Sequence, residues 1–237
     1  MNRGLATTIL TLVLVMTLSP ALAHELWLAR RDAGLMLCYG HTGSVHEGDG
    51  TLTYPRENVI RIECFNTEGQ RQEVSLSEGS PVVIDEVPAA TCVVFSSGYW
   101  SETPFGTRNL PKTDALAPKR SWLSVETVKR IDIWNRSLSA PLTGDLEIVP
   151  LENPLVLEEG DKARLMVTLD RRPLAGVTVS YDGRERGETD KEGRINIKLR
   201  HSGLQFIQAG QSTPVDSLKC DEVVRTATFV FEVGGDT

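Results

Sequence analysis

The sequence predicts an all-β protein, built as two tandem β-sandwich domains that follow a cleaved signal peptide. Helical periodicity is almost absent along its 237 residues. Short runs rich in β-branched, aliphatic and aromatic residues recur instead, with turn residues between them, which is the pattern of packed antiparallel sheets. The predicted strands cover residues 25–30, 35–41, 59–66, 73–76, 82–85, 91–96 and 122–134, then 162–169, 177–181, 194–199, 205–209 and 226–233.

Residues 1–23 have the features of a signal peptide. Arg3 supplies a short positive start, residues 6–18 are mostly apolar and uncharged, and Ala21-Leu22-Ala23 is the small-x-small pattern that signal peptidase accepts. The apolar run is shorter than the roughly 20 residues of a membrane-spanning helix, and no second long apolar run follows. We therefore expect cleavage after Ala23, a periplasmic location and no membrane span in the mature protein. An uncleaved N-terminal anchor is the alternative.

The charge balance disfavours polyanionic partners. Removing residues 1–23 takes away one Arg and no acid, so the formal net charge changes from −7 to −8. An acidic protein of this kind is a poor ligand for nucleic acid or for an anionic membrane surface. The sequence therefore predicts no nucleic-acid partner.

A domain boundary is predicted between residues 149 and 150. Pro150 and Pro154 interrupt the strand pattern there, and an acidic turn follows at residues 158–161. We assign residues 24–149 to an N-terminal sandwich and residues 150–237 to a second one. In the second, Asp182-Gly183 predicts a hairpin turn and Gly193 a turn with positive φ. This segment resembles transthyretin-like and carboxypeptidase-regulatory-like modules, which usually act as rigid scaffolds.

The chain has four cysteines, which in an oxidising compartment are interpreted first as disulfides. Cys64 and Cys92 each lie in a strand-like run, so that bridge is favoured, and Cys38 would then pair with Cys220. A free Cys38 that serves as a metal ligand is the alternative. No CxxC motif is present, so the spacing does not indicate a zinc ribbon.

Histidines concentrate at the predicted mature N-terminus. The chain has four, and His24, His41 and His46 fall within the first 23 residues after the cleavage site, whereas His201 lies in a predicted turn. As the first residue of the mature chain, His24 would offer both its α-amine and its imidazole to one metal ion. Ordinary surface histidines, grouped by accident, are the alternative interpretation.

A predicted hairpin brings two of these histidines together. If the loop is centred between Asp32 and Ala33, the register places Arg30 opposite Leu35, Leu28 opposite Leu37, Leu26 opposite Tyr39, and His24 opposite His41. Directly opposed residues have Cβ atoms about 4.5–5.5 Å apart, close enough for two imidazoles to share a metal ion. A three-residue loop would shift the register by one residue and separate them.

The glycine-rich segment that follows can complete such a site. It carries His46 and Glu47 between three glycines, which allow the chain to fold back. Nitrogen and oxygen donors of this kind suit Ni²⁺, Co²⁺, Cu²⁺ or Zn²⁺ rather than Mg²⁺ or Ca²⁺. The predicted metal ligands are therefore His24, His41, His46 and Glu47.

No sequence pattern of a common enzyme class is present. The chain lacks GxSxG, HExxH and P-loop motifs, so we expect a protein that is not an enzyme. Residues 97–119 are predicted to form a long irregular loop, and Tyr99, Trp100 and Phe105 within it are a candidate partner-binding surface. The alternative is that these aromatic side chains pack back onto the sandwich.

Several motifs, in order, resemble one periplasmic family. That family is the nickel-transport component of energy-coupling-factor-type nickel and cobalt uptake systems, the NikM-like family. The matching motifs are His24-Glu25-Leu26-Trp27-Leu28, Tyr39-Gly40-His41, Leu146-Glu147-Ile148-Val149-Pro150-Leu151, Arg172-Pro173-Leu174-Ala175-Gly176-Val177 and the terminal 227–233 strand. The resemblance implies two β domains, a periplasmic location and handling of Ni²⁺ or Co²⁺. It places the opening motif of the family on His24 and Glu25, and its Tyr-Gly-His element on His41.

The combined expectation is a periplasmic binding protein that captures Ni²⁺ or Co²⁺ and delivers it to a membrane uptake transporter. Two other functions fit the same sequence. A copper-binding protein would use His24 in a histidine-brace-like site, with Cu²⁺ in place of nickel. A structural or adaptor β-sandwich would bind no metal at all.

Overall fold

The computed structural model describes residues 25–31, 33–40 and 51–234. Its largest element is a nine-stranded sheet whose order is β13-β12-β15-β16-β8-β6-β3-β4, with β7 paired to β6. All strand pairs in it are antiparallel except β16 with β8, which run parallel. The strands of this sheet are β3 (Val59–Phe65), β4 (Arg71–Gln72), β6 (Ala90–Thr103), β7 (Gly106–Arg108), β8 (Arg120–Ile131), β12 (Thr178–Tyr181), β13 (Arg184–Glu188), β15 (Gly203–Pro214) and β16 (Glu222–Val233).

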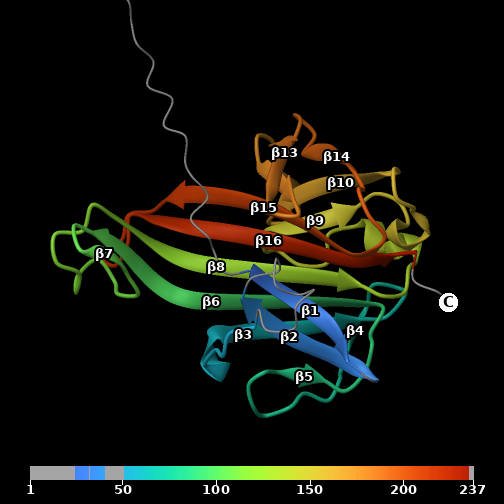
Figure 1. The fold of residues 1–237 in the computed structure, drawn as a ribbon, viewed down its shortest axis with the longest axis horizontal. Helices are drawn as coiled ribbons and strands as arrows, with labels where there is room; N and C mark the ends of the chain where they lie inside the picture. The colour runs from blue at the N-terminus through green and yellow to red at the C-terminus, as the bar shows by residue number, and fades with distance from the viewer. Residues whose placement is uncertain (1–24, 32, 41–50, 235–237) are drawn as a thin grey trace, which may run out of the picture.

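Two small sheets pack against the nine-stranded sheet (Figure 1). The first contains β1 (Glu25–Arg31), β2 (Gly34–Gly40) and β5 (Val83–Ile84). The second contains β9 (Glu147–Pro150), β10 (Lys162–Leu169), β11 (Arg172–Pro173) and β14 (Arg194–Lys198). Short 3-10 turns at Arg56–Asn58, Arg136–Ser139 and Pro154–Val156 lie in the connections.

The two small sheets cover opposite faces of the nine-stranded sheet. Along β16, Phe229 and Phe231 point into the core shared with β9, β10 and β14, while Val230 points into the core shared with β1 and β2. All three side chains are fully buried, and burial of each contributes about 1.5–3 kcal/mol to stability. Because alternate residues of one strand serve two cores, the middle strands carry buried residues on both faces.

The predicted all-β fold and its packed sheets are confirmed. The hairpin turn at Asp182-Gly183 joins β12 to β13 with φ of 50° and 67°, and Gly193 has the expected positive φ of 73°. The boundary predicted between residues 149 and 150 falls inside β9, which pairs with β10. In the described part of the chain, the structure has no helix with the length and apolar character needed to cross a bilayer.

Two local predictions were wrong. Residues 97–103 belong to β6 instead of a loop, because the strand continues beyond a β-bulge between Phe95 and Gly98 and pairs with β8 as far as Arg120. The strand predicted at residues 73–76 is displaced to β4, and Leu76 forms only an isolated bridge with Ile84. The short strands β7, β9, β11 and β13 were not predicted, since two to five residues carry little periodicity.

Candidate metal centre

The β1–β2 hairpin is fixed on the central sheet by buried side chains and by one buried cation. Leu26, Leu28 and Leu37 are each no more than 2% exposed. The guanidinium of Arg130, on β8, donates a hydrogen bond from Nη1 to the carbonyl oxygen of Leu28 at 3.1 Å. These contacts determine where on the sheet β1 begins and β2 ends.

The register of this hairpin is the predicted one. The three predicted pairs within the described residues are all present: Arg30 with Leu35, Leu28 with Leu37 and Leu26 with Tyr39. The pairing continues to Glu25 and Gly40 at the open end of the hairpin. The fourth predicted pair, His24 with His41, lies one position further and outside the described residues.

The other predicted ligands, His46 and Glu47, also lie outside the described residues, so the grouping of all four stays a prediction. The described chain nevertheless shows where segment 41–50 starts and ends. Gly40 and Thr51 form an isolated antiparallel bridge, and the N–H of Leu52 donates to the carbonyl oxygen of Tyr39 at 2.6 Å. Segment 41–50 therefore leaves and rejoins the described structure at the open end of the hairpin.

A buried carboxyl group lies beside this end of the hairpin. Glu126, on β8, is 7% exposed and faces the same side of the sheet as Val128, in the core that β1 and β2 cover. Its Oε1 accepts hydrogen bonds from the hydroxyls of Ser124 at 3.3 Å and Ser97 at 3.5 Å. We call Tyr39, Ser97, Ser124 and Glu126 the Glu126 cluster.

Tyr39 connects the Glu126 cluster to the hairpin. Its ring stacks on that of Phe95, with centroids 5.0 Å apart and an interplanar angle of 30°. Phe95 is the residue of β6 that pairs with Glu126 of β8. The phenol of Tyr39 is hydrogen-bonded to Ser97. Tyr39 pairs with Leu26 on β1, so Glu126 lies close to the point where the described chain begins.

Burial perturbs the titration of both acids in the cluster. Loss of solvent around Glu126 raises the pKa of its carboxyl from 4.5 to about 7, against the smaller opposing effect of the two serine hydrogen bonds. Burial, and then the negative charge of Glu126, raise the pKa of Tyr39 to about 12. A buried carboxyl of this kind is energetically receptive to a cation, which would compensate its charge.

Glu126 was missed by sequence reasoning. It stands in the alternating run Ser124-Val125-Glu126-Thr127-Val128, where an acid replaces an apolar residue at a strand position. The signal was present, but β8 carries buried residues on both faces, so the sequence did not show which face meets the hairpin. Within residues 25–31, 33–40 and 51–234, no three His, Cys, Asp or Glu side chains come together as a complete metal site.

The predicted disulfides are absent. All four cysteines are buried thiols. Cys64 pairs with Thr91 across β3 and β6, whereas Cys92 pairs with Glu63, so the two cysteines are one register position apart. Because side chains alternate along a strand, Cys64 points into the core under β1 and β2, and Cys92 into the opposite core. The sheet itself separates the two sulfur atoms.

The second predicted bridge, between Cys38 and Cys220, joins two distant places. Cys38 lies on β2 in the core beneath the hairpin, and its Sγ is 3.6 Å from the carbonyl oxygen of Met36. Cys220 precedes β16, beside Asp221, whose N–H donates to the carbonyl oxygen of Ser121 at the start of β8. Burial raises the pKa of Cys38 to about 11, so its thiol is protonated at neutral pH.

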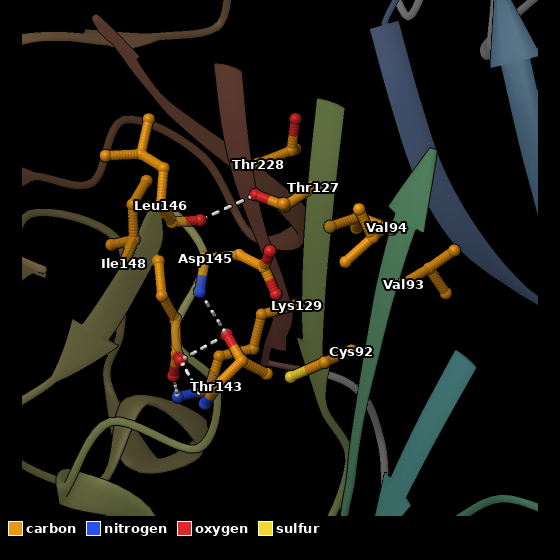
Figure 2. Close-up of a pocket in the computed structure, with 12 residues that line it drawn as sticks. Cys92, Val93, Val94, Thr127, Lys129, Thr143, Asp145, Leu146, Ile148 and Thr228 are labelled. Atoms are coloured by element: carbon orange, nitrogen blue, oxygen red, sulfur yellow. Dashed lines mark hydrogen bonds and ion pairs between the residues drawn. The ribbon is translucent and has the colours of Figure 1, made fainter. Parts of the chain in front are cut away.

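A second polar group occupies the other face of the sheet but is structural. Figure 2 shows the hollow around it, lined by Cys92, Lys129 and Thr143 among others, with room for about one water molecule. Lys129 Nζ lies 2.7 Å from Glu147 Oε1, and both side chains are at most 3% exposed. Glu147 also accepts from the N–H groups of Leu142 and Thr143 and from the Thr143 hydroxyl, at 2.8–3.1 Å. Because Lys129 and Glu147 both have hydrogen-bonding partners within the protein, this ion pair holds segment 142–147 on β8.

His201, the histidine predicted to lie in a turn, does so. Its side chain is 42% exposed, and Nε2 lies 3.1 Å from Asp182 Oδ2. Its ring stacks on Tyr181, with centroids 5.7 Å apart. These contacts join the β12–β13 turn to the connection between β14 and β15, on a different part of the chain from the Glu126 cluster.

Comparison with known proteins gives one family model that matches most of the chain. A family model described as "Domain of unknown function (DUF4198)" matches residues 21–213. No curated protein sequence matches. Among solved structures, the N-terminal four Ig domains of Dscam1 isoform 1.9 align at 12% identity with a TM-score of 0.22, covering 73% of this chain and 36% of that one. A structural similarity of this size supports no conclusion about function.

Proposed function

We propose that this chain, which belongs to the DUF4198 family, captures a divalent transition-metal ion outside the cytoplasm and delivers it to a membrane uptake transporter. The metal is Ni²⁺ or Co²⁺, and it binds at the open end of the β1–β2 hairpin. The observation that carries the proposal is the hairpin register, in which Glu25 pairs with Gly40. If this register continues by one residue beyond the described pairs, it would bring His24 opposite His41.

The donor chemistry follows from these two positions. A chain cleaved after Ala23 presents the α-amine and the imidazole of His24 on one residue, and a second imidazole from His41 would stand directly across the hairpin. Neutral nitrogen donors suit late first-row divalent ions. His46 and Glu47 lie in the segment between Gly40 and Thr51, which returns to this position, and are the proposed additional ligands.

The choice of nickel or cobalt rests on the resemblance of the opening motif His24-Glu25-Leu26-Trp27-Leu28 to the nickel-transport component family. Donor type does not decide between nickel and copper, because the general affinity order places Cu²⁺ above Ni²⁺. Competition between the two ions therefore belongs in the experiment that tests the proposal.

Delivery to a transporter needs a surface for docking. Exposed apolar side chains gather in the segments that follow β6 and precede β16: Phe105 is 67% exposed, Leu116 71% and Leu218 86%. The N–H of Lys112 donates to the carbonyl oxygen of Lys219 at 2.8 Å and ties the two segments together. These exposed apolar side chains lie on segments that the Lys112–Lys219 hydrogen bond holds together, and we assign the contact with the transporter to them.

The test of metal capture is native mass spectrometry of the exported protein with an untagged N-terminus, titrated with Ni²⁺. The mature mass reports the cleavage site, and the titration reports stoichiometry. We expect a chain that begins at His24 and binds one Ni²⁺. His24→Ala should lower the Ni²⁺ affinity at least about tenfold, whereas His201→Ala, a histidine control far from the hairpin, should leave it unchanged.

Three results would argue against the proposal. A mature chain that stays metal-free would leave a scaffold or adaptor as the better function. An unchanged Ni²⁺ affinity in His24→Ala would exclude the terminal site. Retention of Cu²⁺ in the presence of a large excess of Ni²⁺ and Co²⁺, together with transport that responds only to copper, would favour the copper-binding alternative.

A further inference from the structure

A groove lies on the central sheet where the core under the second small sheet ends. On β16 and β15, Ala227 and Ala209 belong to that core, and the next residues on the same face are Arg225 and Gln211. The groove has a volume of about 150 Å³, so only a small ligand fits. Its lining residues are Val125 and Thr127 of β8, Arg225 of β16, residues 144–146 before β9, and Leu169 and Asp170 at the end of β10.

Two opposite charges line this groove without a charged partner among the described residues. The guanidinium of Arg225 is half-buried, and its hydrogen bond there is a long one, 3.4 Å from Nη1 to the hydroxyl of Thr213. The carboxylate of Asp170 is exposed and has neither an ion pair nor a hydrogen bond within the described chain. The third charged group, Asp145, differs because it pairs with Arg61. Arg225 and Asp170 are therefore both available to a ligand.

The row of side chains that contains Arg225 does not satisfy its own polar groups. Arg225 pairs with Gln211 of β15 on one side and with Val125 of β8 on the other. The Oε1 atom of Gln211 is buried and has no hydrogen-bond partner in the parts of the chain that the structure describes. Arg225 donates instead to Thr213, two residues along the same strand. Since a guanidinium carries five N–H donors, most of those of Arg225 remain for a bound molecule.

Backbone hydrogen bonds hold the wall that carries Asp170. The hydroxyl of Thr127 donates to the carbonyl oxygen of Leu146 at 2.7 Å, as Figure 2 shows, and so holds segment 144–146 on β8. The N–H of Asp170 donates to the carbonyl oxygen of Gly144 at 2.9 Å. Asp170 and Arg171 adopt φ values of 52° and 60°, which are unfavourable for residues other than glycine and are concentrated at turns and ligand sites. The position of the Asp170 carboxylate is therefore set by a fixed turn.

We propose that this groove binds a small zwitterion, a molecule that carries one carboxylate and one ammonium group on a short carbon chain. The guanidinium of Arg225 binds the carboxylate, for which its planar set of donors is suited. The carboxylate of Asp170 accepts hydrogen bonds from the ammonium group, and the side chains of Val125 and Leu169 contact the carbon atoms. A simple anion fits less well, because Asp145 and Asp170 would repel it. The inference is independent of metal capture at the hairpin.

The test is titration calorimetry of the full exported chain, in chelator, with glycine, β-alanine and γ-aminobutyrate. These probes carry the same two charges at increasing separation, whereas acetate and methylammonium carry one each. We expect at least one zwitterion to bind with one molecule per chain, at least about tenfold more tightly than acetate or methylammonium.

Two variants assign the binding to the groove. Arg225→Gln and Asp170→Asn should each weaken binding of the zwitterion at least about tenfold. Asparagine tolerates positive φ, so Asp170→Asn removes the charge and keeps the turn. The matched controls are Arg164→Gln, at an exposed arginine of β10, and Asp182→Asn, at an aspartate with a φ of 50° in the β12–β13 turn. Both controls should bind the zwitterion as wild type does.

Three results would overturn the inference. The first is that wild type binds none of the three zwitterions. The second is that the zwitterion binds equally well to wild type, Arg225→Gln and Asp170→Asn, which would place its site elsewhere. The third is that acetate binds as tightly as the zwitterions and Asp170→Asn changes nothing, which would show an anion site. Circular dichroism shows whether each variant is folded, and if Arg225→Gln proves unfolded, the comparison of Asp170→Asn with Asp182→Asn decides.

Discussion

Arg130 and Leu28, 102 residues apart in the chain, are joined by a hydrogen bond from the guanidinium Nη1 to the carbonyl oxygen at 3.1 Å. The same guanidinium donates to both carboxylate oxygens of Asp132 at 2.7–3.0 Å. Arg130 is 1% exposed and the Asp132 side chain 3%. This buried ion pair therefore positions β1, and with it the proposed metal site, on the central sheet.

Arg130→Met should destabilise the fold by about 3–5 kcal/mol, because it leaves the buried Asp132 carboxylate unpaired. It should also increase amide hydrogen exchange in β1 more than in β10. Urea denaturation and exchange mass spectrometry provide the two measurements. Arg164→Met, which removes an exposed arginine 3.7 Å from Glu152, should cost less than about 1 kcal/mol. Equal losses of stability in Arg130→Met and Arg164→Met would contradict the role of Arg130 in anchoring β1.

Glu126→Gln should make the metal-free protein more stable at high pH. The folded-state pKa of Glu126 is raised from 4.5 to about 7, so between these values the folded state binds more protons than the unfolded state. Its contribution to stability therefore falls as pH rises through this window and levels off above pH 7. The full difference corresponds to about 3 kcal/mol.

Denaturation of wild type and Glu126→Gln in chelator, at intervals from pH 4 to pH 8.5, checks this. The free energy of unfolding of Glu126→Gln should equal that of wild type near pH 4. Its excess over wild type should grow between pH 4.5 and pH 7 and stay constant at higher pH. A stability difference that does not change with pH would show that the Glu126 carboxyl titrates normally.

The four cysteines should behave as buried free thiols. In the native protein, an aromatic disulfide reagent should react with almost none of Cys38, Cys64, Cys92 and Cys220, because all are buried. After denaturation without reductant, it should titrate four thiols. A count of two or zero in the denatured, unreduced protein would show that bridges form and that this arrangement of the strands is incorrect.

Gly193→Ala should be much more damaging than Gly183→Ala. Both glycines have positive φ, 73° and 67°. A Cβ at residue 193 would lie 2.8 Å from the Leu174 nitrogen and 3.0 Å from the Val167 carbonyl oxygen, whereas at residue 183 it meets nothing within 4 Å. Gly183→Ala should cost about 1–2 kcal/mol of backbone strain, and Gly193→Ala several kcal/mol more. Thermal unfolding of the two variants compares them directly, and similar midpoints would refute the steric argument.

What the sequence determined here is local. The alternation of apolar residues predicted the strands, and the Asp182-Gly183 turn predicted its hairpin. The short Arg31–Gly34 connection predicted the register of β1 and β2 as far as Glu25 and Gly40. Each of these depends on residues within a few positions of one another, where side-chain periodicity and turn chemistry act directly.

Only the tertiary structure decided which faces meet. In a strand that is buried on both sides, the alternation of side chains shows which residues share a face. It does not show which core each face joins. That choice put Cys64 and Cys92 on opposite sides of the sheet, and it put Glu126 on the face that β1 and β2 cover. The parallel pairing of β16 with β8, about 100 residues apart, likewise depends on how the sheets pack together. Packing between distant segments has no local signature, and for that reason the sequence suggested histidines for the candidate site and left its buried carboxylate unseen.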